Sequence, residues 1–330
     1  MAGSGTAHLR RDPRAVLTVS DLVVEFSTRG HERVQAVSDV SFDILEGETM
    51  GLVGESGCGK STTAHAVVQL VAPTSGTIEL DGVDLAALDA ESLRRLRPSF
   101  QMIFQDPVAS LNPLRDVEHI VQEPLQIWRR DRRDEWERDV REVLDAVGLD
   151  LDQVGNRRPR EFSGGQSQRI SIARALVLRP RLLVCDEPVS SLDVSVQAQI
   201  INLLASMQER FDLTLLFIAH DLAVVKNVSD RLAVMYLGKL CEIGDADQVY
   251  GQPAHHYTRA LLASVPQLGA SNGASALEGE IPSATRPPSG CRFRTRCPAA
   301  TELCATQEPV MEEIGPDHFV ACHHPVQTPH

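Results

Sequence analysis

The stretch GESGCGKS, residues 54 to 61, constrains the fold of this chain more than any other feature. It matches the pattern G-x-x-x-x-G-K-[ST] and follows the apolar run ETMGLVG, while the helix-like run STTAHAVVQLV comes after it. Glycines in such a loop let backbone amides turn inward around phosphate oxygens, and the start of the next helix adds its positive dipole end. An ordinary glycine turn containing a lysine is the alternative, but the flanking strand and helix disfavour it. We therefore predict an α/β phosphate-binding fold.

Each residue of this loop has an expected role in holding a nucleotide. The Lys60 ammonium would reach the β and γ phosphates, and the Ser61 hydroxyl would bind Mg²⁺. The loop and the first turn of its helix together form the expected nucleotide-binding set: Gly54, Glu55, Ser56, Gly57, Cys58, Gly59, Lys60, Ser61 and Thr62.

A second stretch, RLLVCDEP at residues 181 to 188, supplies the acidic partner that such a loop needs for its metal. An apolar strand ending in Asp186 places a carboxylate at the carboxyl edge of the sheet, where it would hold Mg²⁺ through water. Glu187 follows directly and is placed to polarise an attacking water as general base. A plain surface acid at the strand end is the alternative for Glu187.

Composition excludes several classes of function. The chain has 330 residues and a formal net charge of −13, which argues against nucleic acid as a partner. Its longest apolar stretches, such as LTLLFIA at 213 to 219, are far shorter than the roughly 20 residues that span a bilayer. Residues 1–14 have no apolar h-region, so we expect a disordered leader and a cytoplasmic protein whose thiols are reduced.

Changes in composition and hydrophobic pattern along the chain indicate one catalytic domain over residues 15–265 and an extension over 266–330. Half-buried antiparallel strands are predicted first, then a mainly helical segment over about 106–170, in which Val140, Val143 and Leu144 share one face. The mixed charge run RRDRRDEWER at 129 to 138 is interpreted as a solvated surface rather than a binding patch. Near-continuous apolar strands then indicate a covered parallel sheet.

The extension carries Cys291, Cys297, Cys304 and Cys322, which are four of the seven cysteines. A reducing compartment argues against disulfides, and the clustering favours a metal site. The spacing C-x5-C-x6-C-x17-C matches neither paired zinc knuckles nor ferredoxin runs, so zinc, an iron-sulfur cluster and no metal all stay open. His318, His323 and His324 would be substitutes if one cysteine were not a ligand.

Three further motifs connect the loop to a known family. FSGGQSQRISIARAL at residues 162 to 176, SSLD at 190 to 193 and IAHD at 218 to 221 accompany the phosphate loop. Over residues 15 to 265 the chain resembles the ATP-binding subunit of an ABC transporter. The resemblance implies an ABC-type P-loop ATPase with a RecA-like parallel-sheet core, an antiparallel β subdomain, a helical signature subdomain and a small, irregular, cysteine-rich C-terminal extension. It also implies ATP as the nucleotide.

In that family two ATPase subunits face each other head to tail, and each ATP lies between the loop of one and the signature sequence of the other. Because one phosphate loop occurs in 330 residues, a second chain is required. The resemblance implies roles for five positions or sets. Phe26 would stack on adenine, with a plain core residue as the alternative, and Gln105 would reach the metal and the attacking water. Asp193 would cross the dimer interface, and His220 would contact the γ-phosphate, with a structural histidine as the alternative. The partner's ATP would be bound by Ser163, Gly164, Gly165 and Gln166.

The stretches FQDPVASLNPL, HHYTRALLASVP and GCRFRTRCP narrow the resemblance to ATPase subunits of oligopeptide and dipeptide importers, the F-type subunit more than the D-type. The implied partners are a different or identical second ATPase subunit, two transmembrane permease subunits at the cytoplasmic face of the membrane and, indirectly, a solute-binding protein. A nickel or other small-solute importer and a soluble, non-transport ABC ATPase are the alternatives. The resemblance also favours a 4Fe-4S cluster on the four cysteines, with zinc as the alternative.

Overall fold

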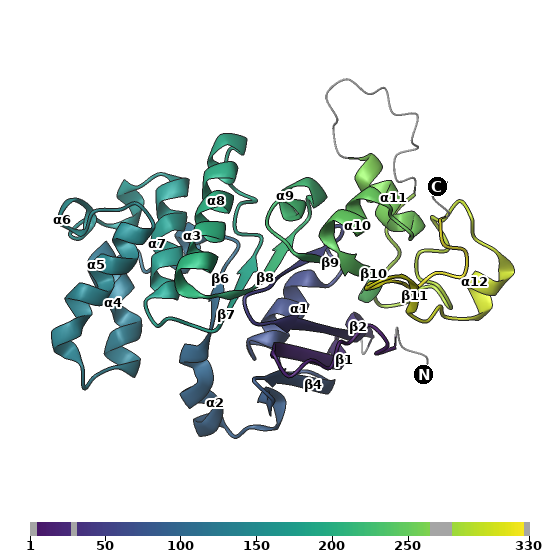
Figure 1. The fold of residues 1–330 in the computed structure, drawn as a ribbon, viewed down its shortest axis with the longest axis horizontal. Coiled ribbons are helices and arrows are strands. Elements are labelled where there is room, and N and C mark those ends of the chain that lie inside the picture. The colour runs from purple at the N-terminus through teal and green to yellow at the C-terminus, as the bar shows by residue number, and fades with distance from the viewer. Residues whose placement is uncertain (1–4, 28–31, 265–278, 327–330) are drawn as a thin grey trace. The chain divides into compact units, whose positions relative to one another are not determined.

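The computed structural model describes residues 5–27, 32–264 and 279–326, which fall into two compact units (Figure 1). Unit 1 contains the residues up to Leu88 and those from Phe217 onward, and unit 2 runs from Asp89 to Leu216. The first part of the predicted extension, residues 266–278, lies outside the described residues. Strand β8, Thr214–Ala219, crosses the boundary between the units, and all of its six residues are buried.

One sheet of unit 1 is antiparallel, as the alternating sequence predicts. Its strand order is β2-β1-β4-β5, and every neighbouring pair is antiparallel. Along β1 the side chains of Val16, Leu17, Val19, Leu22 and Val24 are buried and form much of the core under this sheet. The strands are β1 (Ala15–Ser27), β2 (Arg33–Leu45), β4 (Ser75–Leu80) and β5 (Val83–Asp84), and a 3-10 turn, Leu85–Ala87, follows them.

A second group of strands in unit 1 positions the phosphate loop. Strand β3, Thr49–Val53, is completely buried and pairs in parallel with β9, Arg231–Tyr236. Strand β10, Lys239–Asp245, continues antiparallel from β9. The C-terminal extension then adds β12, His318–Val320, and β11, Glu312–Gly315. The extension is therefore less irregular than predicted, because two of its short strands join the strands beside the loop.

Five helices are present in the described residues of unit 1. Helix α1, Lys60–Val67, starts at the end of the phosphate loop. The others follow the later strands or lie in the extension: α9 (Leu222–Lys226), α10 (Ala246–Gly251), α11 (His256–Ala263) and α12 (Glu302–Thr306).

Unit 2 is mostly helical and contains one parallel strand pair, β6 (Phe100–Ile103) with β7 (Leu182–Asp186). Helix α7, Gly164–Leu176, packs against α3, α4, α5 and β6, and its apolar residues from Ile170 to Leu176 are buried. The remaining helices are α2 (Ala90–Leu96), α3 (Pro107–Ser110), α4 (Val117–Trp128), α5 (Trp136–Ala146), α6 (Leu151–Val154) and α8 (Val194–Phe211), with 3-10 turns at Arg97–Ser99, Arg133–Glu135 and Pro159–Glu161.

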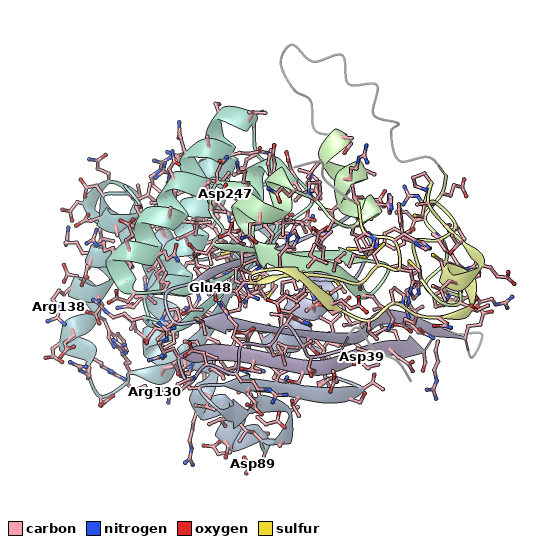
Figure 2. The ribbon with its side chains drawn as sticks, turned by 45° about the vertical axis from the view of Figure 1, so that its right-hand side comes forward. Asp39, Glu48, Asp89, Arg130, Arg138 and Asp247 are labelled. Carbon is pink, nitrogen blue, oxygen red and sulfur yellow. The ribbon has the colours of Figure 1, made fainter. Side chains whose placement is uncertain are left out.

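The predicted apolar face and charged surface of unit 2 are both present. Val140, Val143 and Leu144 are buried on α5. The charge run at 129 to 138 is mostly exposed, and its arginines pair locally, as Arg132 and Arg138 do with Glu135. Figure 2 shows Arg130 and Arg138 reaching outward from this surface. The run is therefore solvated, as predicted.

The leader differs from the prediction of disorder over residues 1–14, because its described part is tied to unit 1. The His8 ring is 1 % exposed, and its Nε2 lies 2.5 Å from the Ser41 carbonyl oxygen. The Arg10 guanidinium pairs with Asp43 at 2.7 Å and with Glu48, labelled in Figure 2, at 2.6 Å. Buried carboxylates need a counter-charge, and Arg10 supplies one from the segment before β1.

The described part of the chain has no helix that is both long and apolar enough to span a membrane.

Candidate functional site

The phosphate loop connects β3 to α1 through three glycines with positive φ. Gly54, Gly57 and Gly59 have φ values of 157°, 79° and 110°. At Gly59 a Cβ atom would lie 2.2 Å from the Ala36 carbonyl oxygen, so no larger residue fits there without moving the backbone. Ser56 and Gly57 are exposed at the tip of the loop, while Ser61 and Thr62 lie partly exposed in the first turn of α1. The loop has the open tip and tight base that a phosphate cradle requires.

Lys60 lies at the base of the loop with its charge turned inward. The residue is 3 % exposed, and its Nζ donates to the carbonyl oxygens of Gly54 at 2.8 Å and Glu55 at 3.0 Å. A buried ammonium is costly unless it is hydrogen-bonded, and these two loop carbonyls satisfy it. The result is a fixed positive charge within the same loop whose amides would face an anion.

Cys58 fits the loop as a small buried residue. It is 3 % exposed, and burial raises the pKa of its thiol. A protonated, covered thiol is a poor nucleophile, so the structure gives Cys58 a packing role rather than a chemical one.

The acidic residues of unit 2 stand at the end of β7. Asp186 is the last residue of the strand and is 4 % exposed. The chain then turns sharply at Glu187, whose φ of 45° lies in the left-handed region that residues with a Cβ rarely adopt. Gln105 Nε2 donates to Glu187 Oε2 at 3.1 Å. Two residues that the sequence places 82 positions apart are thus in direct contact.

The Ser-Gly-Gly-Gln sequence forms an exposed helix start in unit 2. Ser163 is the N-cap of α7: its hydroxyl accepts from the Gln166 amide at 3.3 Å, and Gln166 Oε1 accepts from the Ser163 amide at 3.1 Å. Ser163, Gly164 and Gln166 are exposed. A Cβ on Gly165 would lie 2.6 Å from Val196 Cγ1 at the start of α8, which explains the glycine. This N-terminus presents free amides to an outside anion.

Asp193, Phe26 and His220 lie at exposed positions. Asp193 precedes α8 and makes no side-chain cap bond, and the following Val194 is 81 % exposed. Phe26 lies near the end of β1 opposite Val34 and is 42 % exposed, so the plain-core alternative is wrong for it. His220 follows β8 directly and is exposed at the residue before the N-cap of α9.

The prediction of an iron-sulfur cluster at Cys291, Cys297, Cys304 and Cys322 is wrong. Within residues 5–27, 32–264 and 279–326, which include all four cysteines, no three histidine, cysteine, aspartate or glutamate side chains form a group able to hold a metal ion. The same finding gives no support to zinc. Burial raises the pKa of Cys291 to about 11 and that of Cys322 to about 12, so both are thiols at neutral pH.

Local contacts join the segments that carry two of the cysteines. Cys304 is buried in α12, and its carbonyl oxygen accepts a hydrogen bond from the Cys291 amide at 2.8 Å. The Thr301 hydroxyl lies 3.6 Å from Cys304 Sγ. These contacts fold the extension back on itself between Cys291 and Cys304.

Two residues beside the phosphate loop, Tyr257 and Arg296, lie in stretches that carry the resemblance, but their contact with the loop was not predicted. The Tyr257 hydroxyl accepts a hydrogen bond from the Glu55 amide at 2.7 Å, and the Arg296 guanidinium pairs with the Glu55 carboxylate. They lie 202 and 241 positions from Glu55 in the sequence, so no local pattern could place them there.

Comparison with protein families gives two matches along the chain. The family described as "ABC transporter" matches residues 37–190, and the family described as "Oligopeptide/dipeptide transporter, C-terminal region" matches residues 241–304. The oligopeptide transport ATP-binding protein AppF of Bacillus subtilis is 50% identical over 295 residues, which cover 88% of this chain and 89% of AppF. The oligopeptide transport ATP-binding protein OppF of Salmonella typhimurium is 49% identical over 326 residues, covering 94% and 96%.

Solved structures agree with the fold. The ATP-binding cassette MJ0796, solved as a dimer in a post-hydrolysis state with ADP and Pi, gives a TM-score of 0.62 at 28% identity, covering 70% of this chain and 98% of that one. The cbiO1 protein of Clostridium perfringens, part of the transporter complex cbiONQ, gives a TM-score of 0.63 at 26% identity, covering 72% and 92%.

Proposed function

Because the chain belongs to the ATP-binding subunits of oligopeptide and dipeptide ABC transporters, we propose that it hydrolyses ATP to drive peptide import through a membrane-embedded permease. The observation that carries the ATPase part is the contact between Gln105 and Glu187, beside the buried end of β7. The peptide part is supported by the printed names of the relatives and by the C-terminal region shared with that family. Both relatives described above are F subunits by name, as the resemblance indicates.

Nucleotide binding is assigned to the phosphate loop. Residues Gly54 to Thr62 would surround the phosphates with backbone amides, and Lys60 would exchange its two carbonyl partners for phosphate oxygens. The Lys60 ammonium is already buried and hydrogen-bonded, so ATP binding would not have to transfer this charge out of water. Phe26, exposed near the end of β1, is assigned the adenine ring.

Mg²⁺ is assigned to oxygen donors, which this hard cation prefers. The Ser61 hydroxyl in unit 1 and the Asp186 carboxylate and Gln105 amide oxygen in unit 2 are the candidate ligands. They fit this role because Ser61 lies partly exposed in the first turn of α1 and Asp186 ends a buried strand with its carboxylate. The ion would neutralise charge on the phosphates.

Hydrolysis is assigned to Glu187 as the general base, with Gln105 orienting it and His220 contacting the γ-phosphate. The strained backbone at Glu187 directs the carboxylate out of the strand, and the hydrogen bond from Gln105 fixes one of its oxygens. A carboxylate oriented in this way can accept the proton of an attacking water.

A second ATPase subunit completes the arrangement. Ser163, Gly164, Gly165 and Gln166 are proposed to bind the ATP held by that partner, because a helix N-terminus that is mostly exposed can bind an anion. Asp193 and the exposed Val194 are proposed to cross the interface. Preferential binding of ATP to the closed pair would drive closure, and hydrolysis would release it. We favour a different chain over an identical one as this partner.

The permease is proposed to dock on the segment that follows Gln105. Three apolar side chains are exposed on or beside it: Phe104 at 37 %, Val108 at 53 % and Leu114 at 79 %. Exposed apolar residues gathered in one segment are typical of a protein interface. The chain would thus be a peripheral protein at the cytoplasmic face of the membrane, serving two permease subunits and, through them, a solute-binding protein.

Co-purification from detergent-solubilised membranes tests this proposal. The tagged chain is expected to retain integral membrane subunits, and Leu114→Asp should reduce that retention at least several-fold because it places a charge in an apolar contact. Val83→Asp, which changes a residue 40 % exposed on β5, is the matched control and should retain them. Recovery of the wild-type chain without any membrane partner would rule out the importer function.

A further inference from the structure

Glu55, the second residue of the phosphate loop, is held through all of its polar groups. Its amide donates to the Tyr257 hydroxyl at 2.7 Å. Its carbonyl oxygen accepts from the Cys58 amide at 3.2 Å and from Lys60 Nζ at 3.0 Å. Its carboxylate accepts from both terminal nitrogens of Arg296, at 2.6 and 3.1 Å. The conformation of the loop at Glu55 is therefore set partly by Tyr257 on α11 and by Arg296 in the C-terminal extension.

Arg296 is built into this contact rather than lying on the surface. Its side chain is 4 % exposed, and its guanidinium lies 5.8 Å from the centre of the Tyr236 ring at the end of β9. The hydrogen-bonded pair with Glu55 raises the pKa of Arg296, so its charge is permanent. A two-pronged arginine-carboxylate pair fixes geometry as well as charge, which a single-point contact does not.

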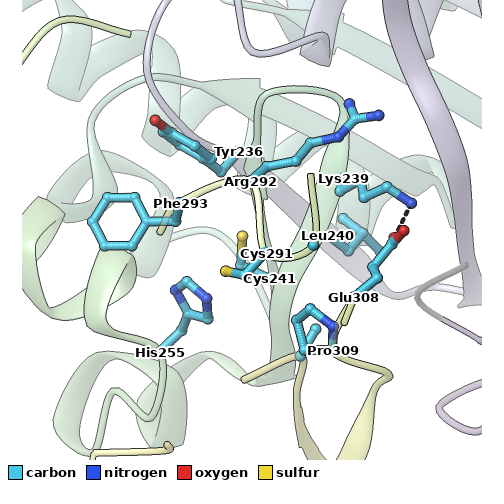
Figure 3. Close-up of a pocket in the computed structure, with 12 residues that line it drawn as sticks. Tyr236, Lys239, Leu240, Cys241, His255, Cys291, Arg292, Phe293, Glu308 and Pro309 are labelled. Carbon is cyan, nitrogen blue, oxygen red and sulfur yellow. Dashed lines mark ion pairs between the residues drawn. The ribbon is translucent and has the colours of Figure 1, made fainter. Parts of the chain in front are cut away.

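The extension is anchored independently of Arg296. The Arg292 guanidinium bonds the Leu237 carbonyl and, at 2.8 Å, Gln35 Oε1. Lys239 pairs with Glu308, the contact dashed in Figure 3. The same view shows Phe293, 2 % exposed, beside Tyr236. The two rings are centred 5.2 Å apart.

A second anchor lies at the end of the extension. Glu242 on β10 is fully buried, and its carboxylate lies 2.7 Å from His318 Nε2 on β12. Since several contacts of this kind hold the extension, replacing Arg296 should not release it. The Arg296–Glu55 pair is therefore not needed to hold the extension in place.

We propose that Arg296 is a positioning residue for ATP binding: it fixes Glu55 and through it the carbonyls that hold Lys60, so that the loop is already shaped for phosphates. This inference rests on the proposed ATPase function and extends it to the C-terminal extension. Pre-organisation of a binding loop lowers the cost of binding without adding contacts to the ligand. Arg296 should therefore influence nucleotide affinity and leave the chemical step largely unchanged.

The test is MgATP binding and steady-state ATP hydrolysis by the full-length chain carrying Arg296→Gln. We expect the Kd for MgATP to rise roughly tenfold, as a coupled pair of this kind allows, and KM to rise with it. The kcat at saturating ATP should stay within about twofold of wild type. Arg296→Lys keeps the charge but cannot form the two-pronged contact with the Glu55 carboxylate. Its Kd for MgATP should lie between those of wild type and Arg296→Gln.

Arg294→Gln is the matched control. Arg294 lies two residues away in the same extension and bonds the carbonyl of Ser289, within the extension itself, at 2.9 Å. Its replacement removes an arginine from the same segment and should leave the Kd for MgATP at the wild-type value. Thermal melting of each variant without nucleotide separates loss of affinity from loss of fold.

A double-mutant cycle with Glu55→Gln decides whether Arg296 acts through Glu55. The two single variants should raise Kd alike, and the double variant should be no worse than either. Equal Kd for wild type and Arg296→Gln, or fully additive effects, would overturn the inference. If Arg296→Gln does not fold, Glu55→Gln alone decides, since an unchanged Kd there would also overturn it. Wild-type protein that binds no MgATP would instead refute the ATPase function.

Discussion

Among single residues, Glu187 is the one whose replacement should separate chemistry from binding. Glu187→Gln keeps the shape and an acceptor for Gln105 but removes the base. We expect turnover to fall by roughly 10²- to 10⁴-fold. The Kd for MgATP should change little, because the phosphate contacts are assigned to the loop. Steady-state ATPase assays and binding of a fluorescent ATP analogue measure the two quantities.

Two comparison variants define that result. Glu209→Gln changes an exposed acid on α8 and should leave turnover unchanged. Lys60→Ala should weaken binding itself, because the buried ammonium is removed from the loop. Near-normal turnover in Glu187→Gln would show that Glu187 is not the base.

Residue-level prediction from sequence succeeds where chemistry fixes local spacing. The glycine loop, the acid at the strand end and the Ser-Gly-Gly-Gln helix start each occupy a few consecutive positions, and the structure places them on the expected loop, strand and helix. Tyr257 and Arg296 escape prediction because their contact with Glu55 is created by tertiary packing. The metal site predicted from the cysteines was wrong, because the number of residues between two cysteines does not fix the directions of their side chains.

At the scale of elements, the start of α11 is sensitive to acid. His255 is its N-cap, and its Nδ1 accepts the Tyr257 amide at 3.0 Å, so the ring must be neutral at that nitrogen. Burial lowers the pKa of His255 from 6.5 to about 4. Above pH 6.5 both folded and unfolded histidine are neutral and the contribution to stability is complete. Below it the unfolded chain takes up a proton that the folded chain does not, so stability falls until the pH reaches about 4.

We predict that His255→Asn reduces this acid sensitivity. Asparagine caps helices well but does not titrate in this range. The wild-type free energy of unfolding should lose up to about 1.4 kcal/mol per pH unit through His255, and the variant should lack that part of the slope. Urea unfolding at several pH values between 7 and 4.5 measures it. Because burial also lowers the pKa of His8, part of the slope should persist in both proteins, and identical slopes would refute the role of His255.

The elements themselves were predictable to differing degrees. Long patterned segments such as β1 and α5 appear as expected, because burial of one face selects their period. Strands β11 and β12 were not predicted, since they have four and three residues and too few positions to show alternation. They form because β10 offers an edge to pair with.

At the scale of the molecule, the extension needs no metal to be part of unit 1. The sequence suggested a metal site because four cysteines cluster in the extension and a reducing compartment argues against disulfides. In the structure the extension instead packs against neighbouring elements of unit 1. Phe293 enters the aromatic group of Tyr236 and Tyr257, and β12 extends the strands beside the loop.

The last prediction concerns assembly of two ATPase subunits. Ser163→Asp and Ser163→Asn both preserve a good N-cap on α7, so the helix should remain intact in each. They differ in one negative charge at the helix start that is proposed to receive the partner's ATP. In a Glu187→Gln background, where bound ATP persists, the Asp variant should repel the phosphates and lose MgATP-dependent association, whereas the Asn variant should keep most of it. The proposed partner is a different subunit, so light scattering after size exclusion is performed on this chain alone and with a second ATPase subunit of the same transporter. Equal association of the Asp and Asn variants would show that this helix start does not face the phosphates of a partner.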